Sequence, residues 1–170
     1  MTSPLWERTE TDRLILRRPT TTDLDEMFAV HGDPLTNLHN PAGPDADVEA
    51  SARRLRSFMD DWTSFGIGYW TVVLKSDGEV IGFAGLRKME WHARDILNLY
   101  YRFKPAAWGY GFATEVAMTA VTVVGKHFPD IPVVVRIRPS NEAAITVARK
   151  IGLHRRPALE SEHMVFVSQW

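Results

Sequence analysis

Residues 108–115 read WGYGFATE and stand between a strand-like segment at 96–103 (ILNLYYRF) and a helix-like segment at 113–128 (ATEVAMTAVTVVGKHF). Glycine lets a backbone turn sharply or approach a ligand because it has no Cβ. A helix that starts after such a turn presents unpaired N–H groups and the positive end of its dipole. The stretch therefore predicts a strand–turn–helix elbow that binds a phosphate. An ordinary turn is the alternative, since paired glycines are a weak motif by themselves.

Two kinds of nucleotide-binding protein carry glycine-rich turns of this type. In the dinucleotide fingerprint, the third small residue would fall on Thr114, and the next strand ends in Arg136 and Arg138, where an acidic ribose ligand is expected. A P-loop requires Gly-Lys-Ser/Thr, which does not follow the elbow. The sequence therefore disfavours a nucleotide-dependent oxidoreductase.

The composition limits the class of protein. A chain of 170 residues, 45% hydrophobic and 24% charged, fits one soluble domain over residues 1–170. Its net charge of −1 provides no basic field for nucleic acid. The absence of cysteine excludes disulfides, cysteine-based zinc sites and a thiolate nucleophile. With no apolar run of about 18 residues and no apolar leader, we expect a cytoplasmic protein that has no membrane partner. We also expect no bound metal ion.

Hydrophobic periodicity and turn residues predict the remaining elements. They are a strand at 13–19, a helix capped by Thr22, a loop at 31–45, a helix over 48–62, a hairpin over 68–90, a strand at 133–138, a helix over 141–152 ended by Gly152, and short C-terminal strands. This order predicts an α/β fold with a mixed, mostly antiparallel central sheet of about seven strands flanked by about four helices. Residues 1–10 are expected to form a loosely packed N-terminus.

Four segments together resemble the GCN5-related N-acetyltransferases (GNAT), most closely their RimJ/RimL-type branch. The segments are ETDRLILRRPTTTDLDEMF (10–28), GEVIGFAGL (78–86), FKPAAWGYGFATEVAMTAV (103–121) and VRIRPSNEAAITVARKIGLHRR (135–156). Their order and distances match the family over residues 10–168. The resemblance implies acetyl-CoA as co-substrate and a protein N-terminal or small-molecule amine as acceptor.

The family's coenzyme-binding residues can be carried over by position. The elbow at Trp108–Thr114 resembles the pyrophosphate loop, with the N–H groups of Gly109, Tyr110, Gly111, Phe112 and Ala113 directed at the phosphates. The strand before it, with Leu99, Tyr100, Tyr101 and Phe103, would pair with the pantetheine arm and offer an N–H group to the thioester oxygen. Asn141 matches an asparagine that meets the coenzyme arm, although a helix cap is an equal alternative.

Three alanines depart from the family pattern. Ala106 stands where the phosphate loop of the family usually opens with Gln or Arg. Ala148 stands where many members carry a tyrosine that acts as the general acid for the leaving thiolate, and Ala144 stands where the RimL-like branch often has serine. The resemblance therefore leaves the general acid unassigned. A non-catalytic acyl-CoA-binding or interaction module on the same fold stays an alternative.

The acceptor amine attacks only when it is neutral. At pH 7 deprotonation costs about 1.4 kcal/mol for an α-amine and about 4.6 kcal/mol for a lysine. Candidate bases are Glu90, His92, Asp95, Asn98 through a water molecule, and His39, and for each a solvated surface role is the alternative. We therefore expect direct transfer of the acetyl group, in a ternary complex, to a small-molecule or peptide α-amine. A homodimer is a further expectation.

Overall fold

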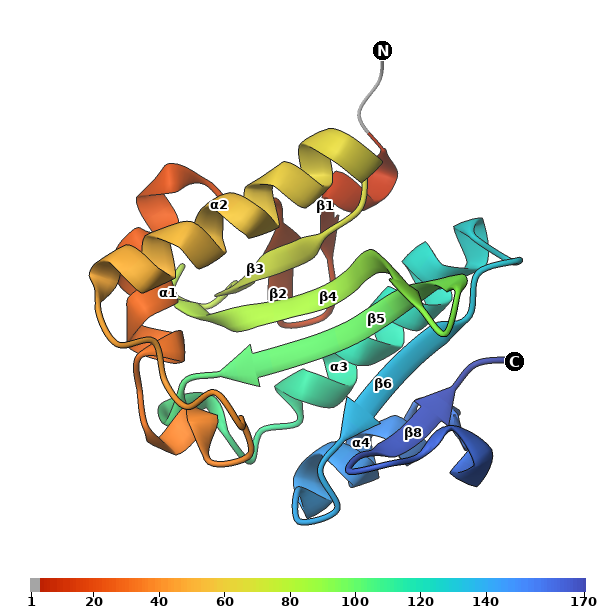
Figure 1. Cartoon of the computed structure of the whole chain (residues 1–170). Helices are drawn as coiled ribbons and strands as arrows, with labels where there is room; N and C mark the ends of the chain where they lie inside the picture. The colour runs from red at the N-terminus through yellow and green to blue at the C-terminus, as the bar shows by residue number, and fades with distance from the viewer. Residues whose placement is uncertain (1–3) are drawn as a thin grey trace.

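The computed structural model describes residues 4–170, which form one sheet with helices on both faces (Figure 1). The strands are β1 (Arg8–Glu10), β2 (Leu14–Arg17), β3 (Tyr69–Leu74), β4 (Val80–Trp91), β5 (Arg94–Phe103), β6 (Val133–Ile137), β7 (His154–Arg155) and β8 (Met164–Val167). The helices are α1 (Leu24–His31), α2 (Val48–Phe65), α3 (Phe112–Thr119) and α4 (Glu142–Lys150). The predicted α/β class, with a mostly antiparallel sheet and four helices, is confirmed.

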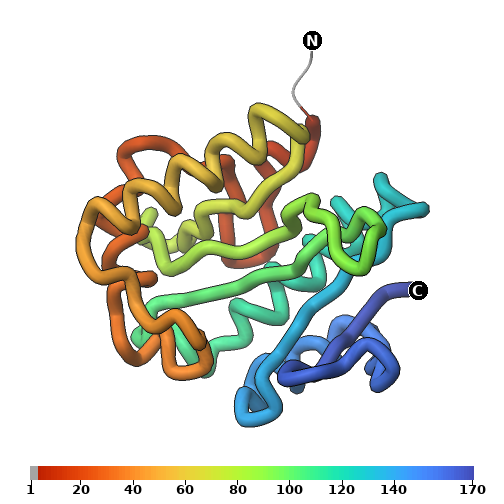
Figure 2. The backbone as a smooth tube through the Cα atoms, in the orientation of Figure 1, coloured from red at the N-terminus to blue at the C-terminus, as the bar shows by residue number. Residues whose placement is uncertain are grey.

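The strands lie in the order β1-β2-β3-β4-β5-β6-β8-β7. Every neighbouring pair is antiparallel except β5 and β6, which are parallel because α3 carries the chain back across the sheet. This parallel ladder holds two bridges, Leu97 with Val133 and Asn98 with Val134. Beyond them the two strands diverge toward their C-terminal ends (Figure 2).

The sequence prediction missed the edge strand β1. The expectation of a loosely packed N-terminus does not hold for residues 4–10, because β1 pairs with β2 and Trp6 forms two hydrogen bonds, one through its indole and one through its backbone carbonyl. The Trp6 indole donates to Gly66 O at 3.0 Å, and the Trp70 indole donates to Trp6 O at 2.7 Å. Residues 1–3, which belong to the same expectation, lie outside the described part of the chain.

Two helix predictions need correction at their ends. Thr20, not Thr22, caps the entry to α1, in a capping box with Asp23. The segment at 113–128 is not one continuous helix, since α3 ends at Thr119 and a π-helical turn (Ala120–Val124) and a 3-10 turn (Gly125–His127) follow. The β-branched run at 121–124 crowds the preceding turn of an α-helix, which accounts for this early end.

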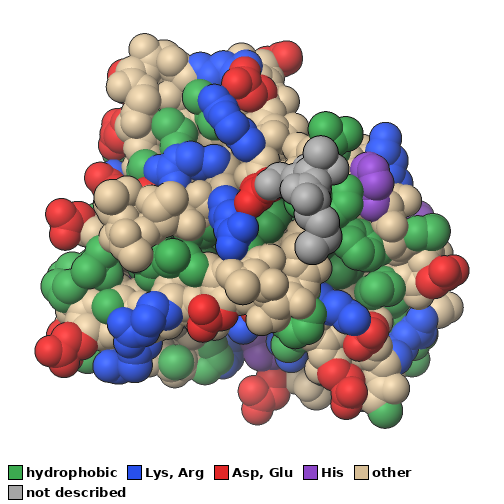
Figure 3. Space-filling model, turned by 90° about the horizontal axis from the view of Figure 1, so that it is seen from above, with side chains coloured by type: hydrophobic (Ala, Val, Ile, Leu, Met, Phe, Trp, Pro, Cys, Tyr) green, Lys and Arg blue, Asp and Glu red, His purple; other side chains and the backbone are tan. Residues whose placement is uncertain are grey.

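Each face of the sheet has its own core. α1 and α2 cover one face around Met27, Val30, Leu55, Phe58, Tyr69 and Phe83. α3 and α4 cover the other, where Leu97, Leu99 and Phe103 of β5 join the larger core. One acidic side chain of α2 is not exposed: Asp61 is buried and paired with Arg87 at 2.9 Å. Seen from above α2, acidic and basic side chains are interspersed on the surface (Figure 3), consistent with the net charge of −1.

Candidate active site

The elbow after β5 has the conformation that its glycines predict. Gly109 and Gly111 have φ values of +83° and +81°, in the left-handed region that favours glycine. Gly111 is the N-cap residue of α3, and no side chain in the described part of the chain caps this helix end. The first-turn N–H groups of α3 are therefore left for an external acceptor, and the adjoining helix dipole favours an anion.

A clamp from the distant N-terminal segment holds the elbow. The Arg13 guanidinium donates from Nε to Glu115 Oε2 at 2.7 Å and from Nη1 to Tyr110 O at 2.8 Å, and it lies 4.4 Å from the centre of the Phe112 ring. Burial alone would raise the pKa of Glu115, but hydrogen bonds from Thr11 and Arg13 lower it. Arg13 thereby neutralises the one carboxylate in the first turn of α3, which would otherwise repel a phosphate.

The divergence of β5 and β6 leaves part of the β5 backbone facing a gap. Leu97 N–H donates to Pro132 O at 2.9 Å, toward β6. Backbone groups of alternate residues point the same way along a strand, so the N–H of Tyr101 also points toward β6, three residues beyond the last bridge at Asn98. The gap therefore offers a backbone donor beyond the end of the parallel ladder.

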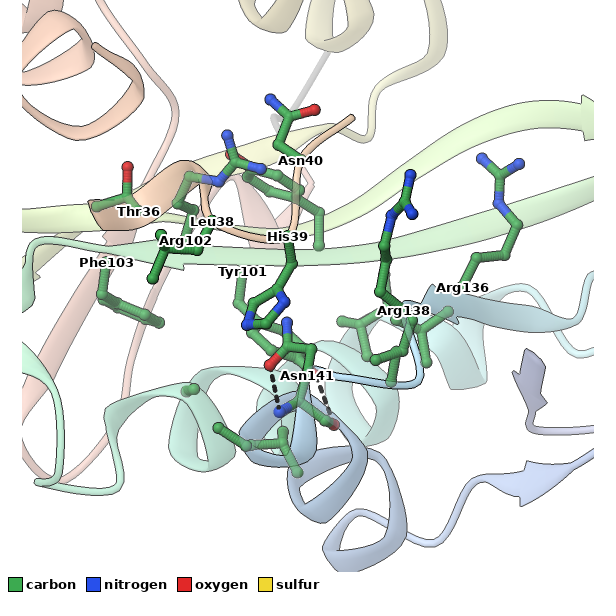
Figure 4. A pocket seen from close by; sticks show the side chains of 18 of the residues that line it. Thr36, Leu38, His39, Asn40, Tyr101, Arg102, Phe103, Arg136, Arg138 and Asn141 are labelled. Carbon is green, nitrogen blue, oxygen red and sulfur yellow. Dashed lines mark hydrogen bonds between the residues drawn. The ribbon is translucent and has the colours of Figure 1, made fainter. Parts of the chain in front are cut away.

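A cavity of about 410 Å³ occupies this gap and reaches both faces of the sheet. Seven of the predicted coenzyme-binding residues line it: Leu99, Tyr100, Tyr101, Phe103, Trp108, Ala113 and Asn141. Residues 35, 36 and 38–40 of the long loop after α1 cover the α1/α2 side (Figure 4). Tyr110 and Phe112 instead line a second cavity of about 570 Å³, which also includes Ala106.

A family model described as an acetyltransferase (GNAT) domain matches residues 13–154 of the chain. The chain belongs to the GNAT acetyltransferase family. The match spans the clamp, the elbow, both strands of the gap and α4, so the residues described above fall within it.

Other comparisons place this GNAT domain among solved and curated relatives. An acetyltransferase from Agrobacterium tumefaciens str. C58 has a TM-score of 0.83 with 21% identity, covering 100% of this chain and 96% of its own. A spermidine N-acetyltransferase from Vibrio cholerae, solved with CoA and spermine, has a TM-score of 0.73 with 14% identity, covering 92% and 94%. YkkB of Bacillus subtilis, described as uncharacterized, is 29% identical over 90 residues, so the match spans about half of each chain.

The GNAT domain does not bring the predicted carboxylate bases to the cavity. Glu90 and Asp95 face each other at the closed end of the β4–β5 hairpin, where Asp95 pairs with Lys88 at 3.0 Å, and His92 forms the turn. Asn98 lies at the last bridge to β6, where its amide donates to the Tyr69 hydroxyl at 2.7 Å.

His39 is the candidate base that does line the cavity. Its Nδ1 lies 3.1 Å from Ser140 Oγ, and the close view shows the imidazole beside Asn141 at the start of α4 (Figure 4). Asn141 also lines the cavity, yet its side chain caps α4 by accepting from Ala144 N–H at 3.2 Å. The capping role expected as one alternative is therefore present, and it leaves the amide nitrogen of Asn141 beside the cavity.

Two tyrosines line opposite sides of the gap. The Tyr100 hydroxyl donates to Nε2 of the buried His31, whose Nδ1 donates to Met27 O at 3.1 Å. Burial, together with the charges of Arg54 and Arg102, lowers the pKa of His31 to about 3, so this pair is neutral at pH 7. The Tyr101 hydroxyl crosses to α4 and donates to Ala144 O at 3.0 Å.

Those side chains were not among the sequence predictions for catalysis. The signal for Tyr101 is its position: its hydroxyl lies beside Ala144, one of the two positions where the resemblance expects a polar side chain. Over residues 4–170, no group of His, Asp and Glu side chains could hold a metal ion, and no helix is long and apolar enough to span a membrane.

Proposed function

We propose that the protein transfers an acetyl group from acetyl-CoA directly to a primary amine. One observation carries this proposal: a cavity that begins at an uncapped helix N-terminus runs through the sheet between two diverging strands. A pyrophosphate suits the first feature, and a long, narrow arm with amide groups suits the second. The solved complex of the similar V. cholerae enzyme with CoA supports the same ligand.

The geometry supports acyl transfer at the β5 backbone. With the pyrophosphate at the elbow, the pantetheine arm lies in the gap and its amides bond to the edge of β5. The N–H of Tyr101 then stabilises the negative charge that develops on the thioester oxygen. The amine nitrogen attacks the carbonyl carbon, the C–S bond breaks, and the proton lost by the amine is balanced by the one gained by the thiolate.

His39 is the base that the arrangement favours. It lines the cavity on the side where an acceptor enters, and it can take the amine's proton directly or through one water molecule. An α-amine or another weakly basic amine needs little help at pH 7, which favours a peptide N-terminus or a small-molecule amine over a lysine side chain. We propose membership of the RimJ/RimL-type branch on the same basis. A homodimer and a cytoplasmic location stay predictions of the sequence.

Steady-state kinetics with acetyl-CoA and amine both varied test direct transfer. Intersecting lines are expected, because the sequence contains no cysteine to carry the acetyl group. Parallel lines would contradict direct transfer and indicate an acyl-enzyme, for which Ser140, bonded to His39, is the first candidate.

The non-catalytic alternative has one observation in its favour: no carboxylate is among the described residues that line the cavity. Thermal stabilisation by acetyl-CoA without thiol release over a broad amine panel would support it. Sustained thiol release with any amine would exclude it.

A further inference from the structure

The α1/α2 side of the cavity carries a concentration of positive charge. Three arginines, Arg102, Arg136 and Arg138, line it, and no Asp or Glu is among the described residues that do so. Figure 4 shows the three arginine side chains rising from β5 and β6 on the same side, away from α4. This side faces the acceptor, because the elbow and α4 occupy the other.

The alternation of side chains places Arg102, and Arg138 directly after β6, on the same face of the sheet. The last bridge joins Asn98 to Val134, and each arginine follows its bridging residue by four positions. Side chains of alternate residues share a face, so Asn98 and Arg102 lie on one side of β5, and Val134 and Arg138 lie on the same side of β6. The two guanidinium groups therefore flank the gap where the parallel ladder has ended.

Neither guanidinium is neutralised by a carboxylate within the described residues, since no ion pair within 4.0 Å involves Arg102, Arg136 or Arg138. Arg102 donates to Asn37 Oδ1 at 2.8 Å, a neutral contact that fixes its direction. Among residues 4–170, no acceptor bonds to the buried Nε of Arg138. Arg138 itself lines the cavity, so its guanidinium keeps its charge and N–H donors for an acceptor atom of a ligand.

We infer that the acceptor amine carries an anionic oxygen group, a carboxylate or a phosphate, which Arg102 and Arg138 bind. This inference rests on the proposed acetyl transfer and adds the class of acceptor. A planar guanidinium matches the oxygens of either anion with paired N–H donors. A polycation such as the spermine in the V. cholerae complex would be repelled by the same arginines, and no described carboxylate lines the cavity to attract it.

The test compares matched amines by the rate of CoA thiol release. One pair is an L-amino acid and its carboxamide, a second is phosphoethanolamine and ethanolamine, and spermidine is added as a cation. The anionic member of at least one pair should be favoured in kcat/KM by tenfold or more. The preferred pair distinguishes carboxylate from phosphate. The carboxamide has the less basic amine, so a preference for the amino acid cannot come from easier deprotonation.

Variants then assign the preference to the arginines. Arg138→Ala should raise KM for the anionic amine at least tenfold, Arg138→Lys should restore part of the loss, and Arg102→Gln should act in the same direction. Arg53→Ala, at an exposed position of α2 outside the cavity, is the matched control. Circular dichroism confirms that each variant is folded, and calorimetric titration of CoA should give a Kd within about threefold of the parent protein.

Each other outcome has a defined meaning. Equal or faster turnover of the uncharged member in both pairs, or faster turnover of spermidine than of every anionic amine, overturns the inference and leaves acetyl transfer standing. A large loss of CoA affinity in Arg138→Ala also overturns it, because the arginine would then belong to the coenzyme site. Absence of thiol release with every amine, while CoA still binds, overturns the proposed function and the inference with it.

Discussion

Gly111 and Gly152 form a matched pair for testing the elbow. Gly111 caps α3 with a φ of +81°, and Gly152 follows α4 with a φ of +83°. An added Cβ at Gly111 would meet Arg13 Nη2 at 3.7 Å, an ordinary contact, and one at Gly152 would meet nothing within 4 Å. Alanine at either position therefore costs only the left-handed conformation, about 1–2 kcal/mol.

The two variants should separate stability from coenzyme binding. Each is expected to lower Tm by about 2–8 °C, from about 2–4 °C per kcal/mol for a domain of this size. Only Gly111→Ala should also weaken CoA binding, because an alanine that relaxes from the left-handed conformation turns N–H groups of the elbow away from the phosphates. Two hydrogen bonds to charged oxygens at about 1.5–3 kcal/mol each correspond to a loss of about a hundredfold or more.

Calorimetric titration of CoA into both variants, with thermal melting followed by circular dichroism, makes the comparison. The reasoning is refuted if Gly111→Ala melts like Gly152→Ala and yet binds CoA within about threefold of the parent protein, a difference of about 0.7 kcal/mol. The elbow would then be an ordinary turn.

Variants at three further positions test the clamp, the base and the cap. Glu115→Gln should lower the free energy of unfolding by about 1.5–3 kcal/mol at pH 7. Since the pKa of Glu115 is lowered in the folded state, this difference in stability from the parent should be full above pH 4.5, the ordinary pKa, and should disappear as the pH falls through the folded-state pKa. Denaturant unfolding from pH 7 to 3 measures it. His39→Ala should lower kcat about tenfold or more at pH 7 with KM for acetyl-CoA unchanged, and the loss should shrink above the amine's pKa of about 8; a pH-independent loss in the rate profile speaks against a base. Asn141→Ala should cost about 1 kcal/mol of stability, which Asn141→Ser should recover by restoring the cap. Because the resemblance also assigns Asn141 to the coenzyme arm, calorimetric titration should show weakened CoA binding in both variants. Recovery of CoA affinity in Asn141→Ser would mean that Asn141 is only a cap.

Local patterns were sufficient for the elements that build the coenzyme side. The spacing of Ala144, Val147, Ala148 and Ile151 predicts the inward face of α4, and Gly152 predicts its end. In the structure Ala144, Ala148 and Ile151 are buried, Val147 packs partly buried against the same core, and Gly152 follows the helix. Gly109 and Gly111 predict the elbow because a left-handed backbone requires glycine there. These features depend on neighbouring residues, so one sequence contains enough information to find them.

Tight turns without the usual residues were not predictable. His92 and Ala93 join β4 to β5 with φ values of 51° and 56°, a conformation that hairpins usually give to Asn-Gly. Without that signal, the length of the hairpin is hidden, and so is the placement of Glu90 and Asp95 at its far end, away from the cavity.

Contacts between distant segments were also beyond the sequence. Arg13 and Glu115 meet across 102 residues, and nothing local in either segment marks the pair. Arg102 and Arg138 differ in this respect, since the alternation in YYRF and VRIR gives the face of each strand. Only the parallel register, which is a tertiary property, shows that the two faces coincide.

The brevity of the β5–β6 ladder affects how the chain opens and closes as well as what it binds. β4 and β5 pair over ten positions, whereas β5 and β6 pair over two, so few backbone bonds join the C-terminal strands to the rest of the sheet. Local opening is easiest where such bonds are sparse, and amides of β6 should therefore exchange with solvent sooner than those of β4. A molecule bound across the joint raises the free energy of that opening. Hydrogen exchange in β6 thus becomes a gauge of occupancy that needs neither a substrate nor turnover.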